Sequence, residues 1–379
     1  MKTNLKKLLY SGVTLMSLGV LAACSTASSS TTTSSSVTTS QSATGSSNST
    51  ASNSNSSSID WSSLPTTEVT LSNDGLKITE GGTYILTGST TAGVTVETDA
   101  NVRIILAGAD ISSSDTAAIN VIKADNVELE IKDGTSNTVK DTSNHSDTNI
   151  EGAIHVEADL TITGNGNLTV EGNFQDGIVS TDDLVINASN IKVTAVDDGI
   201  RGKDSLTING GTIDVTAGGD GIKSTNDTDT TKGYTRITGG DITVKAGDDA
   251  IKAETALTID GGTITVPESL EALEGTNITI NGGTLDVYGS DDAINAASTT
   301  STDIFIKVTG GDLKVAVGSG DTDAFDANGD IYISGGTIDV TAPTSAFDFD
   351  GTAELTGGTV TVNGEQISQI VATGPGARW

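Results

Sequence analysis

The sequence predicts an all-β chain folded as a parallel β-helix with coils of about 22 residues. An acidic residue followed by Gly or Ala and a large apolar residue recurs at intervals of 22, 22, 29, 22, 21, 31 and 22 residues. A Gly-Gly pair that introduces an alternating strand recurs between these phrases, and no stretch after residue 60 has helical periodicity. A fixed period marks a solenoid, and short β-branched runs between Gly, Asn and Asp turns make it a β-solenoid. The phrases begin at Asp176, Asp198, Asp220, Asp249, Glu271, Asp292, Asp323 and, in degenerate form, Ser345.

The N-terminal 60 residues are predicted to lie outside this fold. Residues 1–23 combine three lysines with an apolar run, and they resemble a bacterial lipoprotein signal peptide that ends before Cys24. The resemblance implies lipidation of Cys24 and a position on the extracellular face of the cell membrane. Residues 24–60 are rich in Ser and Thr, which predicts a flexible tether. Residues 61–379 form the β-helix, and their first strands, over 66–139, follow a looser period.

Two insertions interrupt the period at the same point of the coil. They cover residues 224–233 and 296–302, directly after the acidic-apolar strand. A solenoid accepts extra residues in its turns, so both loops should project from one side. The polar stretch 141–150 is expected to be a third such loop.

Composition narrows the possible partners and chemistry. The chain has 50 acidic and 19 basic residues, a formal net charge of −31, which argues against binding to nucleic acid or to an anionic membrane surface. Cys24 is the single cysteine, so the folded part holds neither a disulfide nor a cysteine-based site.

The repeated acids should form a column of stacked carboxylates. Two unit charges ~4.8 Å apart repel by about 0.9 kcal/mol in water and about 3.5 kcal/mol at an effective dielectric constant of 20. Basic side chains, backbone N–H groups of the turns, or a hard divalent cation would offset this repulsion. Oxygen ligands with high local charge favour Ca²⁺; solvated aspartates capped by N–H groups are the alternative. The candidate Ca²⁺ ligands are Asp198, Asp220, Asp248, Asp249, Glu271, Asp291, Asp292, Asp321, Asp323 and Asp326.

A row of cations should run beside this column. Arg201, Lys223 and Lys252 each follow the apolar residue of the phrase, so strand alternation turns them outward. Such a row would hold the carboxylates of an acidic polysaccharide, either directly or through Ca²⁺, whereas the alternative is an internal ladder of ion pairs. Tyr234 lies beside the first insertion and is a candidate for stacking against a sugar.

The Gly-Gly-Thr-Ile turns, the Asp-Gly-Ile-Lys and Asp-Ala-Ile-Lys phrases and the lipoprotein start resemble a bacterial family of secreted carbohydrate-binding β-helix proteins. That family has a right-handed, pectate-lyase-like fold, and its described member binds cellulose and polygalacturonate and carries Ca²⁺. The resemblance implies an acidic or cellulosic polysaccharide as partner.

Two other functions stay open. One is an adhesion or spacer module without a sugar site. The other is a pectate-lyase-like enzyme, which needs an Arg or Lys base near the metal, a role open to Arg201, Lys223 and Lys252. His145 and His155 lack the Gly-His-Gly context of polygalacturonases, and the Asp pairs belong to the repeat. We therefore assign no catalytic residue and favour binding over catalysis.

Overall fold

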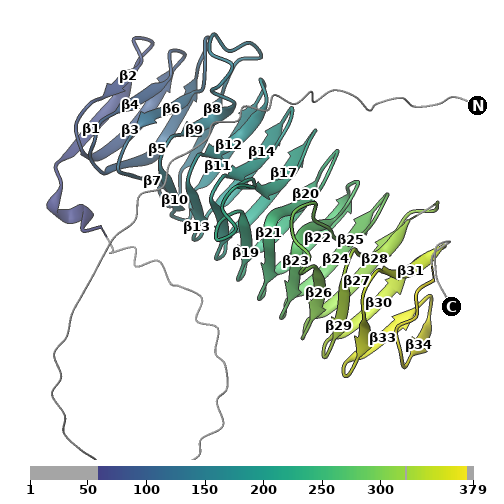
Figure 1. Cartoon of the computed structure of the whole chain (residues 1–379). Helices are drawn as coiled ribbons and strands as arrows, with labels where there is room; N and C mark the ends of the chain where they lie inside the picture. Colours follow the sequence, from purple (N-terminus) through teal and green to yellow (C-terminus); the bar gives the residue numbers. More distant parts are fainter. Residues whose placement is uncertain (1–58, 321, 374–379) are drawn as a thin grey trace, which may run out of the picture. The chain divides into compact units, whose positions relative to one another are not determined.

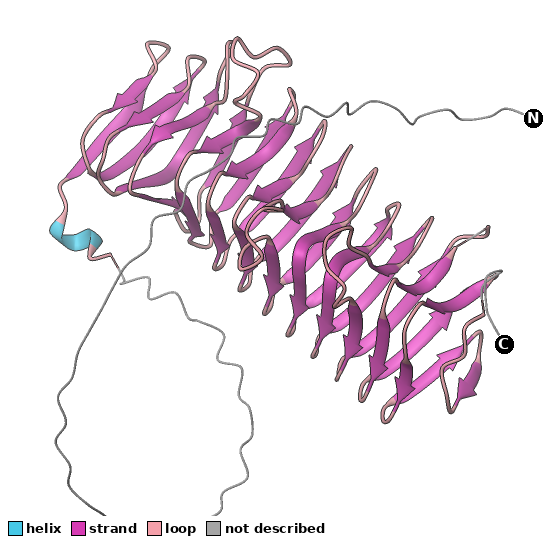
Figure 2. Ribbon diagram, viewed as in Figure 1, coloured by secondary structure: helices cyan, strands magenta, loops and turns pink. Residues whose placement is uncertain are grey.

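The computed structural model describes residues 59–320 and 322–373, so the predictions for Cys24, Asp321 and residues 1–58 fall outside the described part. The described residues are almost entirely strand, with one short 3-10 helix, η1 (Trp61–Ser63). The strands form a long sheet dominated by parallel pairs (Figures 1 and 2), which is a β-helix-like arrangement and not a closed barrel. No helix among these residues has the length and apolar character needed to cross a bilayer.

Each regular coil contributes one strand to each of three parallel ladders, which we call sheets A, B and C. Sheet A contains β2 (Leu76–Ile78), β4 (Val94–Glu97), β6 (Ile119–Lys123), β9 (Gly152–Val156), β12 (Asp176–Ser180), β15 (Ile200–Gly202), β18 (Ile222–Ser224), the first halves of β21 (Ile251–Ile259) and β23 (Leu273–Ile280), β25 (Ile294–Ala296), β28 (Asp323–Ala327) and β31 (Ser345–Phe349).

Sheet B contains β1 (Thr66–Leu71), the first parts of β3 (Gly82–Thr90) and β5 (Val102–Ser112), β7 (Asn126–Ile131), β10 (Asp159–Thr163), β13 (Asp183–Ile186), β16 (Ser205–Ile208), β19 (Tyr234–Ile237), the second halves of β21 and β23, β26 (Phe305–Val308), β29 (Asp330–Ile333) and β32 (Ala353–Leu355).

Sheet C contains the last parts of β3 and β5, β8 (Ser136–Lys140), β11 (Asn167–Gly172), β14 (Asn190–Ala195), β17 (Thr212–Ala217), β20 (Asp241–Lys245), β22 (Thr263–Glu268), β24 (Thr284–Gly289), β27 (Asp312–Val317), β30 (Thr337–Thr341) and β33 (Thr359–Val362). The final strand, β34 (Glu365–Ile367), pairs antiparallel with β33 and ends the stack.

The core consists of equivalent apolar residues stacked from coil to coil. In sheet A, Ile200, Ile222 and Ile251 are in register and fully buried. Towards the C-terminal end the same position holds Phe325 and Phe347, whose ring centroids lie 5.2 Å apart, which confirms their predicted place inside the coil. Alternation along each short strand therefore separates a dry interior from an outward face that is free to vary.

The Gly-Gly phrase has a backbone explanation. Its second glycine has a positive φ in every regular coil; at Gly211 the angle is +104°. A Cβ atom there would lie 2.4 Å from the carbonyl oxygen of Ser189 in the preceding coil. The turn into sheet C thus requires both a conformation that favours glycine and the space that glycine leaves.

The two insertions connect strands of sheet A to strands of sheet B, as the period predicts. Residues 225–233 join β18 to β19, and residues 297–304 join β25 to β26. The expectation that residues 141–150 form a third loop of this set was wrong, because they join β8 of sheet C to β9 of sheet A and so occupy a different turn. Inside that loop His145 is buried, with its Nε2 3.0 Å from Asp141 Oδ2 and its ring stacked on Phe174.

Candidate functional site

The repeated acids form the predicted column, and the backbone of the next coil supplies part of the compensation. Asp176 Oδ1 accepts a hydrogen bond from the N–H of Asp198 at 3.1 Å, and Asp198 Oδ1 accepts one from Asp220 at 3.0 Å. Asp220 Oδ1 accepts in the same way from Asp249 at 3.0 Å. These four carboxyl groups are buried. Each acid therefore links two coils, as in the alternative in which turn N–H groups cap the aspartates.

The three predicted cations are in register and form ion pairs with this column. Arg201 Nη2 lies 2.7 Å from Asp176 Oδ2, in the preceding coil, and Arg201 also pairs with Glu151. Lys223 Nζ lies 3.0 Å from Asp220 Oδ2 and also pairs with Asp198. The first half of the row is thus an internal ion-pair ladder.

Lys252 ends the ladder. Its Nζ lies 2.8 Å from Asp249 Oδ2, and it also pairs with Glu274 of the following coil. The three cationic side chains remain 19 to 26% exposed, so their outer edges still face solvent.

The outward position next to the column changes sign after Lys252. It continues in register through Glu274, Asn295, Asp326 and Asp348, and the sequence holds no lysine or arginine between Lys252 and Lys307. Burial, together with the charges of neighbouring carboxylates, raises the pKa of Asp326 to about 7. The second half of the column therefore holds negative charge that basic side chains do not balance.

The carboxyl groups around the sign change also have raised pKa values. Burial, and then a hydrogen bond with Glu274, raises the pKa of Asp249 to about 8. Burial and the charge of Asp249 raise the pKa of Glu271 to about 7, despite a hydrogen bond from Asn295 Nδ2 at 3.0 Å. Each of these groups gives up its proton only at a cost, which a nearby cation would reduce.

Two groups of three carboxylates have oxygens close enough to share a metal ion. In each group the three oxygens lie within 4.8 Å of one another, and Asp249 belongs to both. Sequence reasoning did not select Glu274, although its place after the repeated apolar residue put it beside the column. The groups are Asp220, Asp248 and Asp249, and Asp249, Glu271 and Glu274.

The other predicted ligands lie elsewhere along the stack. Asp198 is part of the ion-pair ladder with Lys223. Asp291 is exposed, in the turn before β25. Asp292 Oδ1 accepts a 2.7 Å hydrogen bond from the N–H of Asp323. The structure places Asp326 near both, since their charges contribute to its raised pKa.

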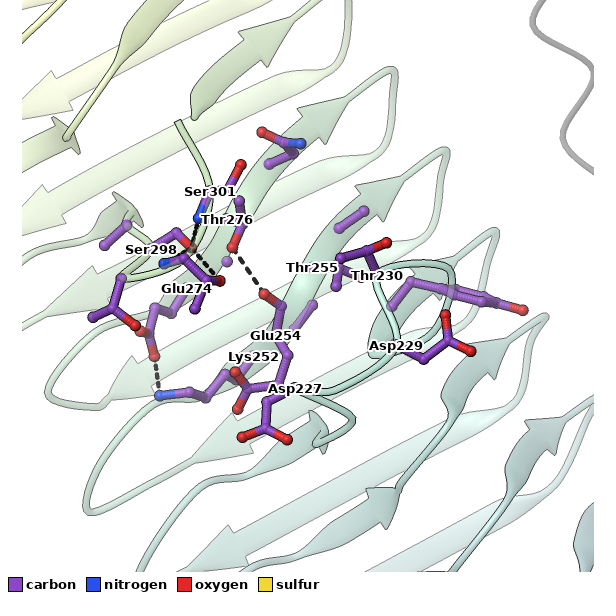
Figure 3. Close-up of a pocket in the computed structure, with 18 of the residues that line it drawn as sticks. Asp227, Asp229, Thr230, Lys252, Glu254, Thr255, Glu274, Thr276, Ser298 and Ser301 are labelled. Carbon is purple, nitrogen blue, oxygen red and sulfur yellow. Dashed lines mark hydrogen bonds and ion pairs between the residues drawn. The ribbon is translucent and has the colours of Figure 1, made fainter. Parts of the chain in front are cut away.

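A groove of about 710 Å³ lies beside the sign change, between the two insertion loops. Its floor comes from β21 and β23, and residues 227–231 and 297–301 form its walls. Tyr234 and Lys252, two of the predicted sugar contacts, line it, whereas Arg201 and Lys223 do not. Figure 3 shows carboxylates and hydroxyls facing this space. The lining residues missed from the sequence include Asp227, Glu254, Thr276, Asn277 and Ser298.

Hydrogen bonds within the loops fix the walls of the groove. Asn226 Nδ2 donates to Asp204 Oδ1 at 2.6 Å, and Lys232 pairs with the same carboxylate. In the second loop, Ser298 Oγ accepts from the N–H groups of Thr300 and Ser301 at 3.2 and 3.0 Å. Walls held in this way lose little conformational freedom when a ligand binds.

The geometry can be set beside known proteins. Residues 72–324 match the family of carbohydrate-binding domain-containing proteins. The chain belongs to this family. A carbohydrate-binding domain-containing protein of Acetivibrio thermocellus is 34% identical over 135 residues, which are 34% of this chain and 47% of that protein. The chain therefore matches about half the length of this relative.

A solved structure of another protein shares the architecture. It is the gadolinium derivative of the polysaccharide lyase-like protein from C. thermocellum, with a TM-score of 0.52 and 34% sequence identity. The match covers 60% of this chain and 90% of that one. Family membership and this neighbour together support a carbohydrate-binding role.

Proposed function

We propose that this chain binds polysaccharide in the groove between its two insertion loops. The observation that carries the proposal is the groove itself, whose volume is typical of ligand sites and whose walls come from the two insertions of the period. Tyr234 offers a ring face at one side, and the hydroxyls and amides of Thr276, Asn277 and Ser298 suit the hydroxyl groups of a sugar. The right-handed coil that the family resemblance implies belongs to the same proposal.

We propose further that Ca²⁺ binds along the column, at the two carboxylate groups that share Asp249. Oxygens 2.3–2.6 Å from one ion are at most about 5 Å apart, and the oxygens of both groups meet this limit. The raised pKa values of Asp249 and Glu271 support a site that a cation would stabilise. The similar C. thermocellum protein was solved as a gadolinium derivative, and hard cations prefer oxygen ligands.

Two classes of polymer fit these features. An acidic, pectin-like polymer would be held through Ca²⁺ that bridges its carboxylates to those of the column. A cellulosic polymer would use the groove directly. We propose that the lipid on Cys24 and the tether of residues 24–60 hold the domain at the cell surface, where such polymers are met.

The state of the lysine favours binding over cleavage. A lyase base must take a proton from the substrate. Burial acts to lower the pKa of Lys252, but its hydrogen bonds with Asp249 and Glu274 outweigh this and raise the pKa above its ordinary value. A lysine held in its protonated form is a poor base at neutral pH.

Retention on insoluble polymers tests the proposal. We would measure how much protein stays on polygalacturonate and on cellulose, with Ca²⁺ and with EDTA, and read the absorbance of unsaturated product in the same tubes. Tyr234→Ala should reduce retention on cellulose, whereas Tyr332→Ala, in β29 and outside the groove, should not. Retention without product supports a binding protein. Absorbing product would point to a lyase, and no retention on either polymer would favour the spacer module.

A further inference from the structure

The lining of the groove carries an excess of negative charge. Lys252 is the one basic residue among the lining residues, all of which the structure describes. Its ammonium group already pairs with Glu274, inside the lining, and with Asp249 beneath it. The carboxylates of the lining are Asp227, Asp229, Glu254 and Glu274.

Three of these carboxylates have no basic partner among the described residues. Asp227 and Asp229 are exposed on the first loop, and Glu254 is half-buried in β21, on the floor. The lysine of the same loop, Lys232, is held by Asp204 and does not line the groove. In Figure 3 the side chain of Asp227 lies near that of Glu254, and Asp229 lies farther along the same wall. A ligand in this space therefore meets three carboxylates that lack a counter-charge.

We propose that the groove takes a polysaccharide with free amino groups, that is, a partly N-deacetylated amino-sugar polymer, in preference to a neutral or anionic one. This inference rests on the proposed carbohydrate site and names its ligand class. An ammonium group forms charge-assisted hydrogen bonds with these carboxylates, and the remaining sugar hydroxyls meet Thr276 and Ser298. An acidic polymer is repelled here unless a cation bridges the charges. The net charge of −31 also speeds the approach of a cationic chain.

The test compares oligosaccharides that differ in their amino groups alone. Binding of β-1,4-glucosamine oligomers and of their fully N-acetylated counterparts of equal length is measured by calorimetry, in EDTA, at a pH that keeps the amines protonated. The free amines should bind more tightly, and the advantage should shrink as salt is added. The double variant Asp227→Asn, Glu254→Gln should bind the amine form about three- to tenfold more weakly, as expected for two partly exposed ion pairs.

A matched variant separates the site from the overall charge of the chain. Asp241→Asn with Asp339→Asn removes two exposed carboxylates from the outer face of sheet C, so it has the same net charge as the groove variant. Its affinity should stay at that of the unaltered protein. Equal weakening in both variants would overturn the groove as the site. Equal binding of acetylated and amine forms would overturn the amine preference but leave carbohydrate binding standing. Failure to bind these oligomers, cellulose or polygalacturonate would reject the proposed function as well.

Discussion

Replacing Lys252 with Met should make the protein less stable without Ca²⁺ and more responsive to Ca²⁺. The lysine pairs with two carboxylates, its Nζ lies 2.8 Å from Asp249, and its side chain is 26% exposed. Removing one member of a fully buried pair costs roughly 3–5 kcal/mol; for this exposure we reduce the figure to about 2 kcal/mol. At pH 8 in EDTA the melting temperature should therefore fall by about 4 °C.

Calcium should reverse most of that loss. The variant leaves Asp249, Glu271 and Glu274 without their cation, so a divalent ion should bind more tightly than in the unaltered chain. An ion at 100 times its Kd adds about 2.7 kcal/mol to the free energy of unfolding. Melting curves by circular dichroism, with EDTA and with Ca²⁺, measure both effects. The control is Lys192→Met, an exposed lysine 3.7 Å from Asp214, which should change stability by less than about 0.5 kcal/mol. An unchanged melting temperature in EDTA, or a Ca²⁺ response no larger than that of the unaltered protein, would refute this reasoning.

Three further predictions follow from the column and the turns. Without Ca²⁺, stability should fall as the pH rises from 5 to 8, because the folded-state pKa of Asp326, about 7, exceeds the ordinary 3.8 and its ionisation opposes folding; Asp326→Asn should flatten this dependence in thermal melts. Asp249→Asn, common to both carboxylate groups, should weaken Ca²⁺ binding about tenfold or more in calorimetry, and unchanged affinity would exclude these groups as the metal site. Gly211→Ala should cost about 2–3 kcal/mol in denaturant unfolding, whereas Gly108→Ala, with a φ of +90° but open space around its Cβ, should cost about 1 kcal/mol. Equal losses would show that the carbonyl beside Gly211 is not what requires glycine.

The sequence predicts the coil well because its repeat is written in residues that contact their own equivalents. The isoleucines at 200, 222 and 251 and the acids two residues before them recur at nearly one period, and stacking turns that period directly into columns. The position of the two insertions follows from the same period. The loop at 141–150 was misplaced because its length shows in the sequence, whereas the turn it occupies depends on where the strands of the irregular first coils pair.

The groove could not be predicted in the same way. Glu254 lies on a strand whose pattern resembles that of its neighbours, and nothing in its local sequence marks it. It becomes part of a lining because loops from two coils lie on either side of the strand that carries it. The partners of the cations were also undetermined, since Arg201 reaches back to Asp176 of the preceding coil while Lys252 reaches forward to Glu274 of the following one. Such choices depend on side-chain direction, which the period does not specify.

The parallel register also separates two properties that are usually linked in a globular domain. The residue after each buried apolar residue of sheet A contributes no side chain to the interior, so its charge can differ between coils while the packing beneath stays the same. Gain or loss of one whole coil would move every later column by one strand spacing, about 4.8 Å, and still place each inward side chain over its equivalent. The length of the surface that a polymer meets and the charge pattern on it can therefore change independently during evolution, in whole-coil steps and by single substitutions respectively.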